Sequence, residues 1–220
     1  MPTIYIIAGP NGIGKTTSSY DLVPLNTAII NSDEIAKEVK NAGLITTGNT
    51  QEYSNNEAIR LMEEQRKLQN SFAIETNLSD IETWKFLLEI QQSGYELHVL
   101  YMSTDNIDVL NNRIKERTLL GDHFVKPDIV EERYVIGLKL LNHYFTKPDK
   151  LQLFDNSEKT ILVAEINRGN IIYATQQFPE WITKYLNQHF QTEQKPETKM
   201  KDLKNISEVR DAYKKLKQKR

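Results

Sequence analysis

The residue pattern with the clearest chemistry lies near the amino terminus, where one segment fits the phosphate-binding pattern G-x-x-x-x-G-K-[ST]. In such a loop the glycines let the backbone curl, so that successive N–H groups point at phosphate oxygens, and the following helix adds its positive end. Lys15 would reach the β- and γ-phosphates of a nucleotide, and the hydroxyl of Thr16 would bind Mg²⁺. We therefore predict that ATP and Mg²⁺ bind at Gly9, Pro10, Asn11, Gly12, Ile13, Gly14, Lys15, Thr16 and Thr17.

A second group of polar residues follows two other predicted strands. Asp33 comes just after residues 28–31, and Glu75 ends residues 71–75. Because these strand ends lie on the same rim as the phosphate loop, Asp33 could accept the proton of a hydroxyl that attacks the γ-phosphate. The competing explanations are that Asp33 or Ser32 caps a helix, and that Glu75 is a plain edge carboxylate. We predict Asp33 as the base, and Glu75 as a group that holds a substrate hydroxyl or, through water, Mg²⁺. The substrate-binding candidates are Asp33, Glu75, Thr76, Asn77 and Ser79.

Three arginines flank the turn-rich segment 121–127. Arg113 and Arg117 share one face of a predicted helix, and Arg133 lies on the next helix. Arginines on such a lid can clamp phosphates and neutralise the transferring group. Surface ion pairs of little energetic value are the alternative, and their partners would be Glu116, Glu131 and Glu132. We predict Lys15, Asp33, Arg117 and Arg133 as the catalytic residues and Arg113 as a nucleotide-binding residue.

The elements that must position these residues alternate between strands and helices, which is typical of a parallel sheet covered on both faces. Strands are predicted at residues 3–8, 28–31, 71–75, 95–103 and 151–155, and helices at 15–23, 32–41, 51–69, 80–92, 105–120, 128–144 and 179–190. Residues 161–165 and 171–175 predict an edge hairpin. Asp155 and Asn156 follow the fifth strand, where they would meet the nucleotide base or ribose, with a simple polar turn as the alternative. Ser79 is also a candidate cap for the helix at 80–92.

The predicted fold class is therefore α/β: a three-layer P-loop NTPase fold with a five-stranded, mostly parallel sheet, an edge hairpin and an arginine-bearing helical lid. Residues 1–190 form the predicted nucleotide-binding domain, 191–200 a polar linker, and 201–220 a basic amphipathic helix. Residues 195–220 hold ten Lys/Arg and four Asp/Glu, so the net charge of −2 hides an acidic body and a basic tail. A solvated helix is the ordinary explanation of such a tail, and a partner-, RNA- or membrane-binding extension is the alternative.

Composition excludes several classes of protein. The 220 residues contain no cysteine, so a disulfide framework, a Cys-ligated zinc site and a thiol nucleophile are ruled out. No apolar run approaches the roughly 20 residues that span a bilayer, and we expect a cytoplasmic protein. The segment 146–149 fits the guanine pattern [NT]-K-x-D by its letters, but it precedes a predicted strand instead of following one. The layout that remains is that of a small-molecule kinase.

Five segments in this order resemble the zeta-toxin-like P-loop kinases over roughly residues 3 to 185. They are residues 9–17, residues 31–34, residues 72–79, Arg117 with residues 121–125, and residues 153–157. The resemblance implies an ATP- and Mg²⁺-dependent kinase that phosphorylates a hydroxyl, which in zeta toxins is the 3′-hydroxyl of UDP-N-acetylglucosamine. It implies Asp33 as base, Glu75 as an acceptor- or metal-side carboxylate, and Arg117 and Arg133 as lid arginines. It also implies an antitoxin partner, for which the residues themselves carry no signal.

One segment departs from that family. Plasmid-type toxins carry Glu-Gly-Thr-x-Arg after the third strand, whereas residues 75–79 of this chain read Glu-Thr-Asn-Leu-Ser, without the glycine or the arginine. In plasmid-type toxins that arginine helps to hold the sugar nucleotide. Because this chain lacks it, we expect only that the acceptor is a small molecule with a hydroxyl, and a UDP-amino sugar is one candidate. The alternative function is a nucleotide-dependent regulatory module whose basic tail engages a partner or RNA; nucleic-acid binding is not expected of the body.

Overall fold

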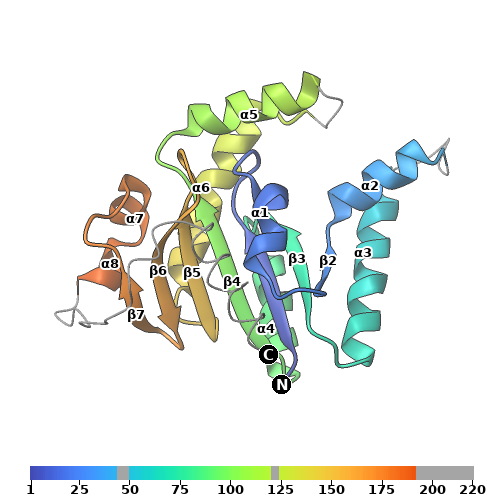
Figure 1. Ribbon diagram of the computed structural model, residues 1–220, viewed down its shortest axis with the longest axis horizontal. Helices are drawn as coiled ribbons and strands as arrows, with labels where there is room; N and C mark the ends of the chain where they lie inside the picture. The colour runs from blue at the N-terminus through green and yellow to red at the C-terminus, as the bar shows by residue number, and fades with distance from the viewer. Residues whose placement is uncertain (44–49, 120–123, 192–220) are drawn as a thin grey trace, which may run out of the picture.

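Five parallel strands and two antiparallel strands form one sheet in the computed structural model, which describes residues 1–43, 50–119 and 124–191 (Figure 1). The strand order is β2-β3-β1-β4-β5-β6-β7, with parallel pairing from β2 to β5 and antiparallel pairing for β6 and β7. The strands are β1 (Thr3–Ala8), β2 (Ala28–Ile30), β3 (Phe72–Thr76), β4 (Glu96–Ser103), β5 (Lys150–Asp155), β6 (Ile161–Asn167) and β7 (Asn170–Ala174). The predicted parallel sheet and its edge hairpin are confirmed.

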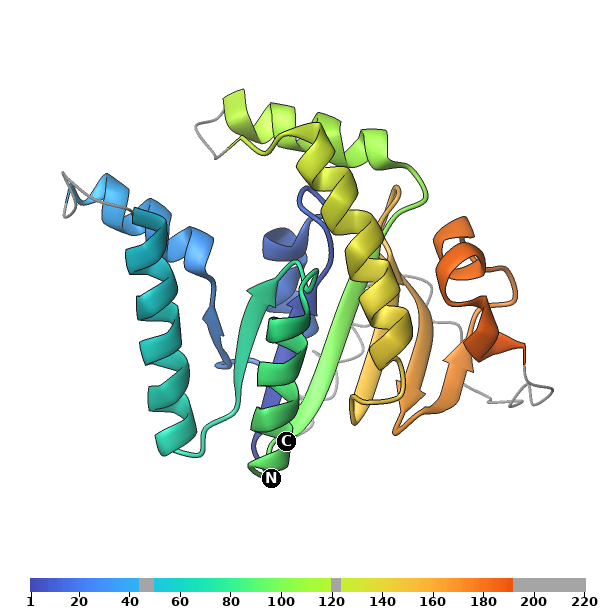
Figure 2. The same cartoon turned by 180° about the vertical axis from the view of Figure 1, so that it is seen from behind.

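Helices cover both faces of this sheet and its carboxyl edge. The helices are α1 (Lys15–Leu22), α2 (Ser32–Asn41), α3 (Thr50–Lys67), α4 (Ile81–Gln92), α5 (Ile107–Leu119), α6 (Pro127–Tyr144), α7 (Glu180–Tyr185) and α8 (Asn187–Phe190). Helix α1 lies on the face toward the viewer in Figure 1, and α4 and α6 lie on the opposite face, in front in Figure 2. The pair α2 and α3 stands beside β2, while α5 crosses above the carboxyl ends of the strands.

The core lies between the central strands and the helices α4 and α6. Ile4 and Ile6 of β1 are fully buried, as are Trp84 of α4 and Tyr101 of β4. Helix α6 approaches β4 closely because Gly137 has no side chain: a Cβ there would lie 2.7 Å from the hydroxyl oxygen of Tyr101. This close seat brings the amino-terminal half of α6 over the edge where the phosphate loop lies.

The starts of two helices correct local expectations about capping. The cap of α2 is Asn31, whose side-chain oxygen accepts hydrogen bonds from the amides of Asp33 (2.9 Å) and Glu34 (3.4 Å), so neither Ser32 nor Asp33 has that role. The cap of α4 is Asp80, which accepts from the amide of Thr83 at 2.7 Å. The capping explanations for Ser32, Asp33 and Ser79 are therefore wrong, which leaves these side chains for other contacts.

The predicted helix at 179–190 is broken into α7 and α8 at Leu186. Leu186 leaves the helical conformation, with φ −123° and ψ 1°, and its side chain is fully buried. Burial of this leucine overrides a pattern that would otherwise continue one helix. The predicted linker at 191–200 and helix at 201–220 lie outside the described residues apart from residue 191.

Candidate functional site

The phosphate loop connects β1 to α1 and is pressed against its neighbours at two glycines. Gly9 has φ +139°, and a Cβ there would lie 2.3 Å from the carbonyl oxygen of Met102. Gly12 has φ +78°, and its Cβ would lie 2.6 Å from the carbonyl oxygen of Leu110. Both positions therefore require glycine for backbone conformation and for close packing on β4 and α5. The two glycines of the sequence pattern therefore stand where the fold leaves no room for a side chain.

Lys15 begins α1 and turns its ammonium back into this loop. Its Nζ donates to the carbonyl oxygens of Gly9 (2.8 Å) and Pro10 (3.1 Å) and to Oδ1 of Asn77 (3.1 Å). Burial lowers the pKa of Lys15 to about 8, although the carboxylates of Glu75 and Asp33 act in the opposite direction. The ammonium is thus held by three neutral oxygens, so its charge is available to a phosphate.

A hydroxyl–carboxylate pair lies beside this lysine. Thr16 Oγ1 donates to Glu75 Oε1 at 3.0 Å, while Oε2 of Glu75 is buried without a hydrogen-bond partner in the part of the chain that the structure describes. Burial raises the pKa of the Glu75 carboxyl, the charges of Glu34 and Asp33 add to this, and Lys15 and Thr16 oppose it. Mg²⁺ is commonly bound by one or two carboxylates together with phosphates and waters. Thr16 and Glu75 fit that donor set, and the sequence predicts the same two residues on the metal side of the site.

Asp33 lies on the first turn of α2, with its side chain exposed. Its carboxylate is close enough to raise the pKa of Lys15, which puts it on the same rim as the phosphate loop. The side chain is not used as a helix cap, because Asn31 has that role. The predicted role of Asp33 as a base would require its carboxylate to reach the proton of an incoming hydroxyl, and that role stays a prediction.

Two of the three predicted arginines bond to neutral oxygens around the loop. Arg133 Nη1 donates to Oδ1 of Asn11 at 2.9 Å. Arg113 donates from Nη1 to the carbonyl oxygen of Asn156 (3.1 Å) and from Nη2 to that of Ser157 (3.3 Å). Within the described residues, these bonds replace the carboxylate ion pairs that were the alternative explanation for Arg113 and Arg133. Arg117 is exposed on α5, and its positive charge lowers the pKa of Lys15, as does that of Arg133.

Asp155, the last residue of β5, and Asn156, which follows it, hold the frame of the site. The side-chain amide of Asn156 donates to the carbonyl oxygen of Ile13, and its Oδ1 accepts from Thr160 at 2.9 Å. Asp155 Oδ1 accepts from the indole nitrogen of Trp181 at 3.1 Å. Sequence reasoning missed these framework roles because the partners lie far away along the chain. The nucleotide contacts predicted for Asp155 and Asn156 stay predictions.

The remaining acceptor-side candidates lie together at the end of β3 and in the connection that follows it. Thr76 Oγ1 accepts from the amide of Leu78 at 3.1 Å, which shapes a turn in which Leu78 has φ +54°. Asn77 contacts Lys15, and Ser79 is half-buried in the same connection. The structure thus brings the loop after β3 against the phosphate loop, as the parallel topology predicts.

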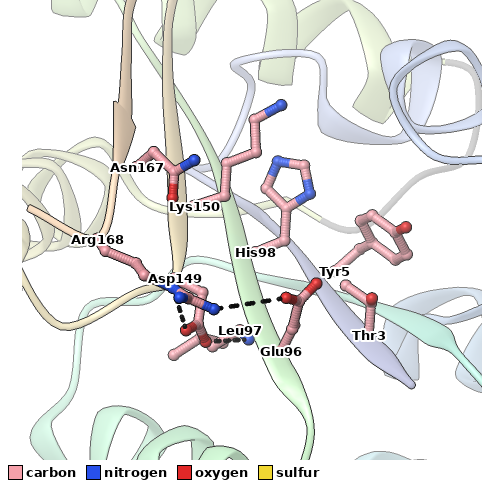
Figure 3. A pocket seen from close by; sticks show the side chains of 9 residues that line it. All are labelled: Thr3, Tyr5, Glu96, Leu97, His98, Asp149, Lys150, Asn167 and Arg168. Carbon is pink, nitrogen blue, oxygen red and sulfur yellow. Dashed lines mark hydrogen bonds and ion pairs between the residues drawn. The ribbon is translucent and has the colours of Figure 1, made fainter. Parts of the chain in front are cut away.

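A cavity of about 290 Å³ lies at the opposite, amino edge of the sheet (Figure 3). Its lining includes Tyr5, His98 and Asp149, and its charges pair with one another: Arg168 lies 3.6 Å from Asp149 and 3.9 Å from Glu96. Asp149 belongs to the guanine-like segment 146–149, which is therefore at the wrong end of the strands to meet a nucleotide in the phosphate loop. This excludes the guanine interpretation of that segment.

None of the described helices has the length and apolar character needed to cross a membrane. No group of three or more His, Cys, Asp or Glu side chains within the described ranges is arranged to hold a metal ion. Mg²⁺ at the phosphate loop would require fewer protein ligands than such a group.

No family model matches the chain. An uncharacterized protein of Haemophilus influenzae is 29% identical over 131 residues, which cover 57% of this chain and 88% of that protein. This similarity assigns no function.

Solved structures give a wider match. One chain of the AvrRxo1-ORF1:AvrRxo1-ORF2 complex with ATP superposes with a TM-score of 0.63 at 15% identity, over 92% of this chain and 67% of that one. A chain of the PezAT chromosomal toxin–antitoxin system of Streptococcus pneumoniae gives a TM-score of 0.52 at 15% identity, over 99% of this chain and 87% of that one. At this identity the likeness shows the fold alone, which is a mostly parallel α/β sheet with antiparallel edge strands.

Proposed function

We propose that this protein is an ATP-dependent phosphotransferase that moves the γ-phosphate to a hydroxyl of a small molecule. One observation carries the proposal: a buried ammonium, that of Lys15, lies in a phosphate loop directly beside the Thr16–Glu75 pair. A glycine-rich turn with only a structural role would gain nothing from a buried charge held by neutral oxygens. The likeness in fold to a complex solved with ATP agrees with this proposal.

The chemistry assigns each residue one task. The loop amides and Lys15 bind the phosphates, and Thr16 and Glu75 would hold Mg²⁺, which neutralises charge on the phosphate oxygens. The acceptor oxygen forms a bond to the γ-phosphorus while the bond from that phosphorus to the β–γ bridging oxygen breaks. Asp33 takes the hydroxyl proton, and ADP leaves. Arg117 and Arg133 stabilise the negative charge of the transferring group.

The acceptor belongs on the side of Asp33 and the loop after β3. The resemblance to zeta-toxin-like kinases makes UDP-N-acetylglucosamine the first acceptor to test. The loop at 75–79 offers Thr76, Asn77 and Ser79 for hydrogen bonds to a hydroxyl-rich molecule in place of the glycine and arginine of plasmid-type toxins. An antitoxin partner is part of the same proposal, supported by the likeness in fold to a chain of a toxin–antitoxin system.

The Asp33→Asn variant tests the proposal. ATP should bind with unchanged affinity, measured by calorimetry, whereas acceptor phosphorylation should fall by about 10²- to 10⁴-fold because the base is lost. Glu38→Gln is the matched control, since Glu38 is an exposed carboxylate further along the same helix. Full activity in Asp33→Asn would refute the assignment of the base. Loss of function on truncation at residue 191, with Asp33→Asn active, would favour the regulatory module.

A further inference from the structure

A hydrogen bond joins a side chain of the phosphate loop to α6, and phosphate binding itself does not explain it. Arg133 of α6 donates from Nη1 to Oδ1 of Asn11 at 2.9 Å, although the two residues lie 122 positions apart. Both side chains are half-buried. A nucleotide bound by the loop would use backbone N–H groups and Lys15, so the side chain of Asn11 is free to serve another purpose.

Helix α6 is already anchored on either side of this contact in the fold. The hydroxyl of Tyr134 donates to the carbonyl oxygen of Thr104 at 2.8 Å, and Gly137 seats the next turn against Tyr101. These contacts fix the backbone around Arg133 but leave its long side chain with several rotatable bonds. The bond to Asn11 is what restrains the guanidinium group itself.

The chemistry of asparagine suits this purpose. An amide oxygen accepts a hydrogen bond without carrying a charge, so the positive charge of Arg133 stays available to a phosphate. A carboxylate at the same place would neutralise the guanidinium and repel the nucleotide. Arginine has five N–H donors, and the bond to Asn11 uses one of them.

Arg113 gives the contrasting case. Its Nη1 and Nη2 donate to the carbonyl oxygens of Asn156 and Ser157, so this guanidinium is bound into the frame of the β5–β6 connection. Arg133 instead touches the phosphate loop itself. Glu131 and Glu132 are exposed neighbours on α6, but the bond that the structure describes for Arg133 goes to Asn11.

We propose that Asn11 is a positioning residue: its side-chain oxygen holds the guanidinium of Arg133 at the phosphate loop before the nucleotide arrives. This inference rests on the proposed phosphotransferase function. An arginine that is placed in advance stabilises the transferring phosphate without the entropic cost of ordering its side chain during the reaction. Asn11 thereby acts on the rate of transfer more than on the binding of ATP.

A double-mutant cycle with Asn11→Ala, Arg133→Ala and the combined variant tests this inference, with ATP as the probe and water or an acceptor as the phosphate receiver. Asn11→Ala should lower the maximal rate by about 10- to 100-fold, the range expected for losing a hydrogen bond to a charged group. Its ATP dissociation constant by calorimetry should stay within about threefold of the parent value. The combined variant should be no slower than Arg133→Ala alone, because Asn11 acts through Arg133.

Two further measurements separate positioning from a structural role. Hydrogen exchange of residues 127–135 should keep the parent rate in Asn11→Ala, because Tyr134 and Gly137 still hold the backbone of α6 in place. Faster exchange in that variant would indicate a structural role and would contradict positioning. Asn11→Asp should bind ATP more weakly because its carboxylate repels phosphate. Glu132→Gln is the matched control and should match the parent protein in every measurement.

The outcomes distinguish this inference from the proposed function. Additive losses in the double-mutant cycle, or an equal loss in Glu132→Gln, would overturn the role of Asn11 while leaving the phosphotransferase intact. An unchanged rate in Asn11→Ala would overturn it as well. Absence of ATP binding by the parent protein would refute the proposed function itself.

Discussion

Charged side chains that are buried or half-buried lie at both the amino edge and the carboxyl edge of the sheet, that is, at the two ends of its parallel strands. Their bonding partners differ between the two edges. At the amino edge the charges pair: Lys150 lies 2.9 Å from Glu165, and Arg168 lies near Asp149. At the carboxyl edge Lys15 bonds to neutral oxygens, and Glu75 keeps one buried oxygen without a partner among the described residues. A polar cluster that satisfies its own charges supports the fold, whereas one that leaves charge uncompensated is suited to a ligand.

This contrast predicts that substitutions at the carboxyl edge cost activity and spare stability, while substitutions at the amino edge do the reverse. A cavity of about 290 Å³ lies at the amino edge, where the side chains already satisfy one another (Figure 3). The presence of a cavity is therefore not enough to mark a ligand site. Charge balance separates the two regions more clearly than volume does.

Lys15→Met should produce the largest effect. Turnover of ATP should fall by about 10²- to 10³-fold, the usual cost of losing one group that stabilises the transition-state charge. The free energy of unfolding at pH 7 should not fall, because burial of the ammonium already lowers its pKa to about 8 and so disfavours the charged form. Steady-state kinetics and urea unfolding measure the two quantities. A variant that loses stability and keeps activity would reverse the assignment of the two edges.

Glu75→Gln should lower Mg²⁺-dependent turnover by about 10- to 100-fold, because a charged contact to the metal side of the site is lost. Stability should be equal or higher, since burial raises the pKa of this carboxyl and the folded state therefore disfavours its charged form. Titration of activity with Mg²⁺, together with urea unfolding, checks both expectations. Unchanged Mg²⁺ dependence would place the metal elsewhere.

His98 gives the amino edge its own pH signature. Burial, with help from the positive charge of Lys150, lowers the pKa of His98 to about 4. The unfolded chain therefore takes up a proton near the ordinary value of 6.5 while the folded chain does not, so stability should be complete above pH 6.5 and should decline as the pH falls toward 4.

The loss from His98 should amount to about 2 kcal/mol, a reduced value because the ring is only partly buried. Urea unfolding between pH 4 and 7 measures the decline, and His98→Gln should flatten it. Turnover in the same variant at pH 7.5 should match the parent protein. A loss of turnover there would connect the two edges.

Arg168→Gln should produce the smallest effect. This arginine is 68% exposed and lies 3.6 Å from Asp149, so the ion pair should contribute less than about 1 kcal/mol. Activity should be unchanged, because Arg168 lines the cavity at the amino ends of the parallel strands (Figure 3), whereas the phosphate loop follows the carboxyl end of β1. Thermal unfolding at low and high salt measures the contribution. A large effect on ATP turnover would show that this cavity takes part in function.

Much of the framework is readable from local patterns. The strand at Thr3–Ala8 has the predicted bounds because it is a short, β-branched apolar run that ends at a glycine, and the helix at Ser32–Asn41 also has its predicted bounds. The break at Leu186 was not readable, since it depends on burial of one side chain. The sequence offers Ser32 and Asp33 as alternative caps of α2 although Asn31 supplies the cap, because adjacent residues of similar capping preference compete and only the backbone angles decide.

The sequence by itself determined the phosphate loop, the alternation of strands and helices, and the rim on which Asp33 and Glu75 lie, because these follow from spacing along the chain. Only the tertiary structure decided which polar side chains bond to one another around the phosphate loop. In the folded chain Asn77 accepts a hydrogen bond from Lys15, and Asn11 accepts one from Arg133. The side-chain amide of Asn156 donates to the carbonyl oxygen of Ile13. Such contacts join residues far apart in sequence, and no local pattern encodes the partner of a hydrogen bond that forms only when the strands and helices are packed together.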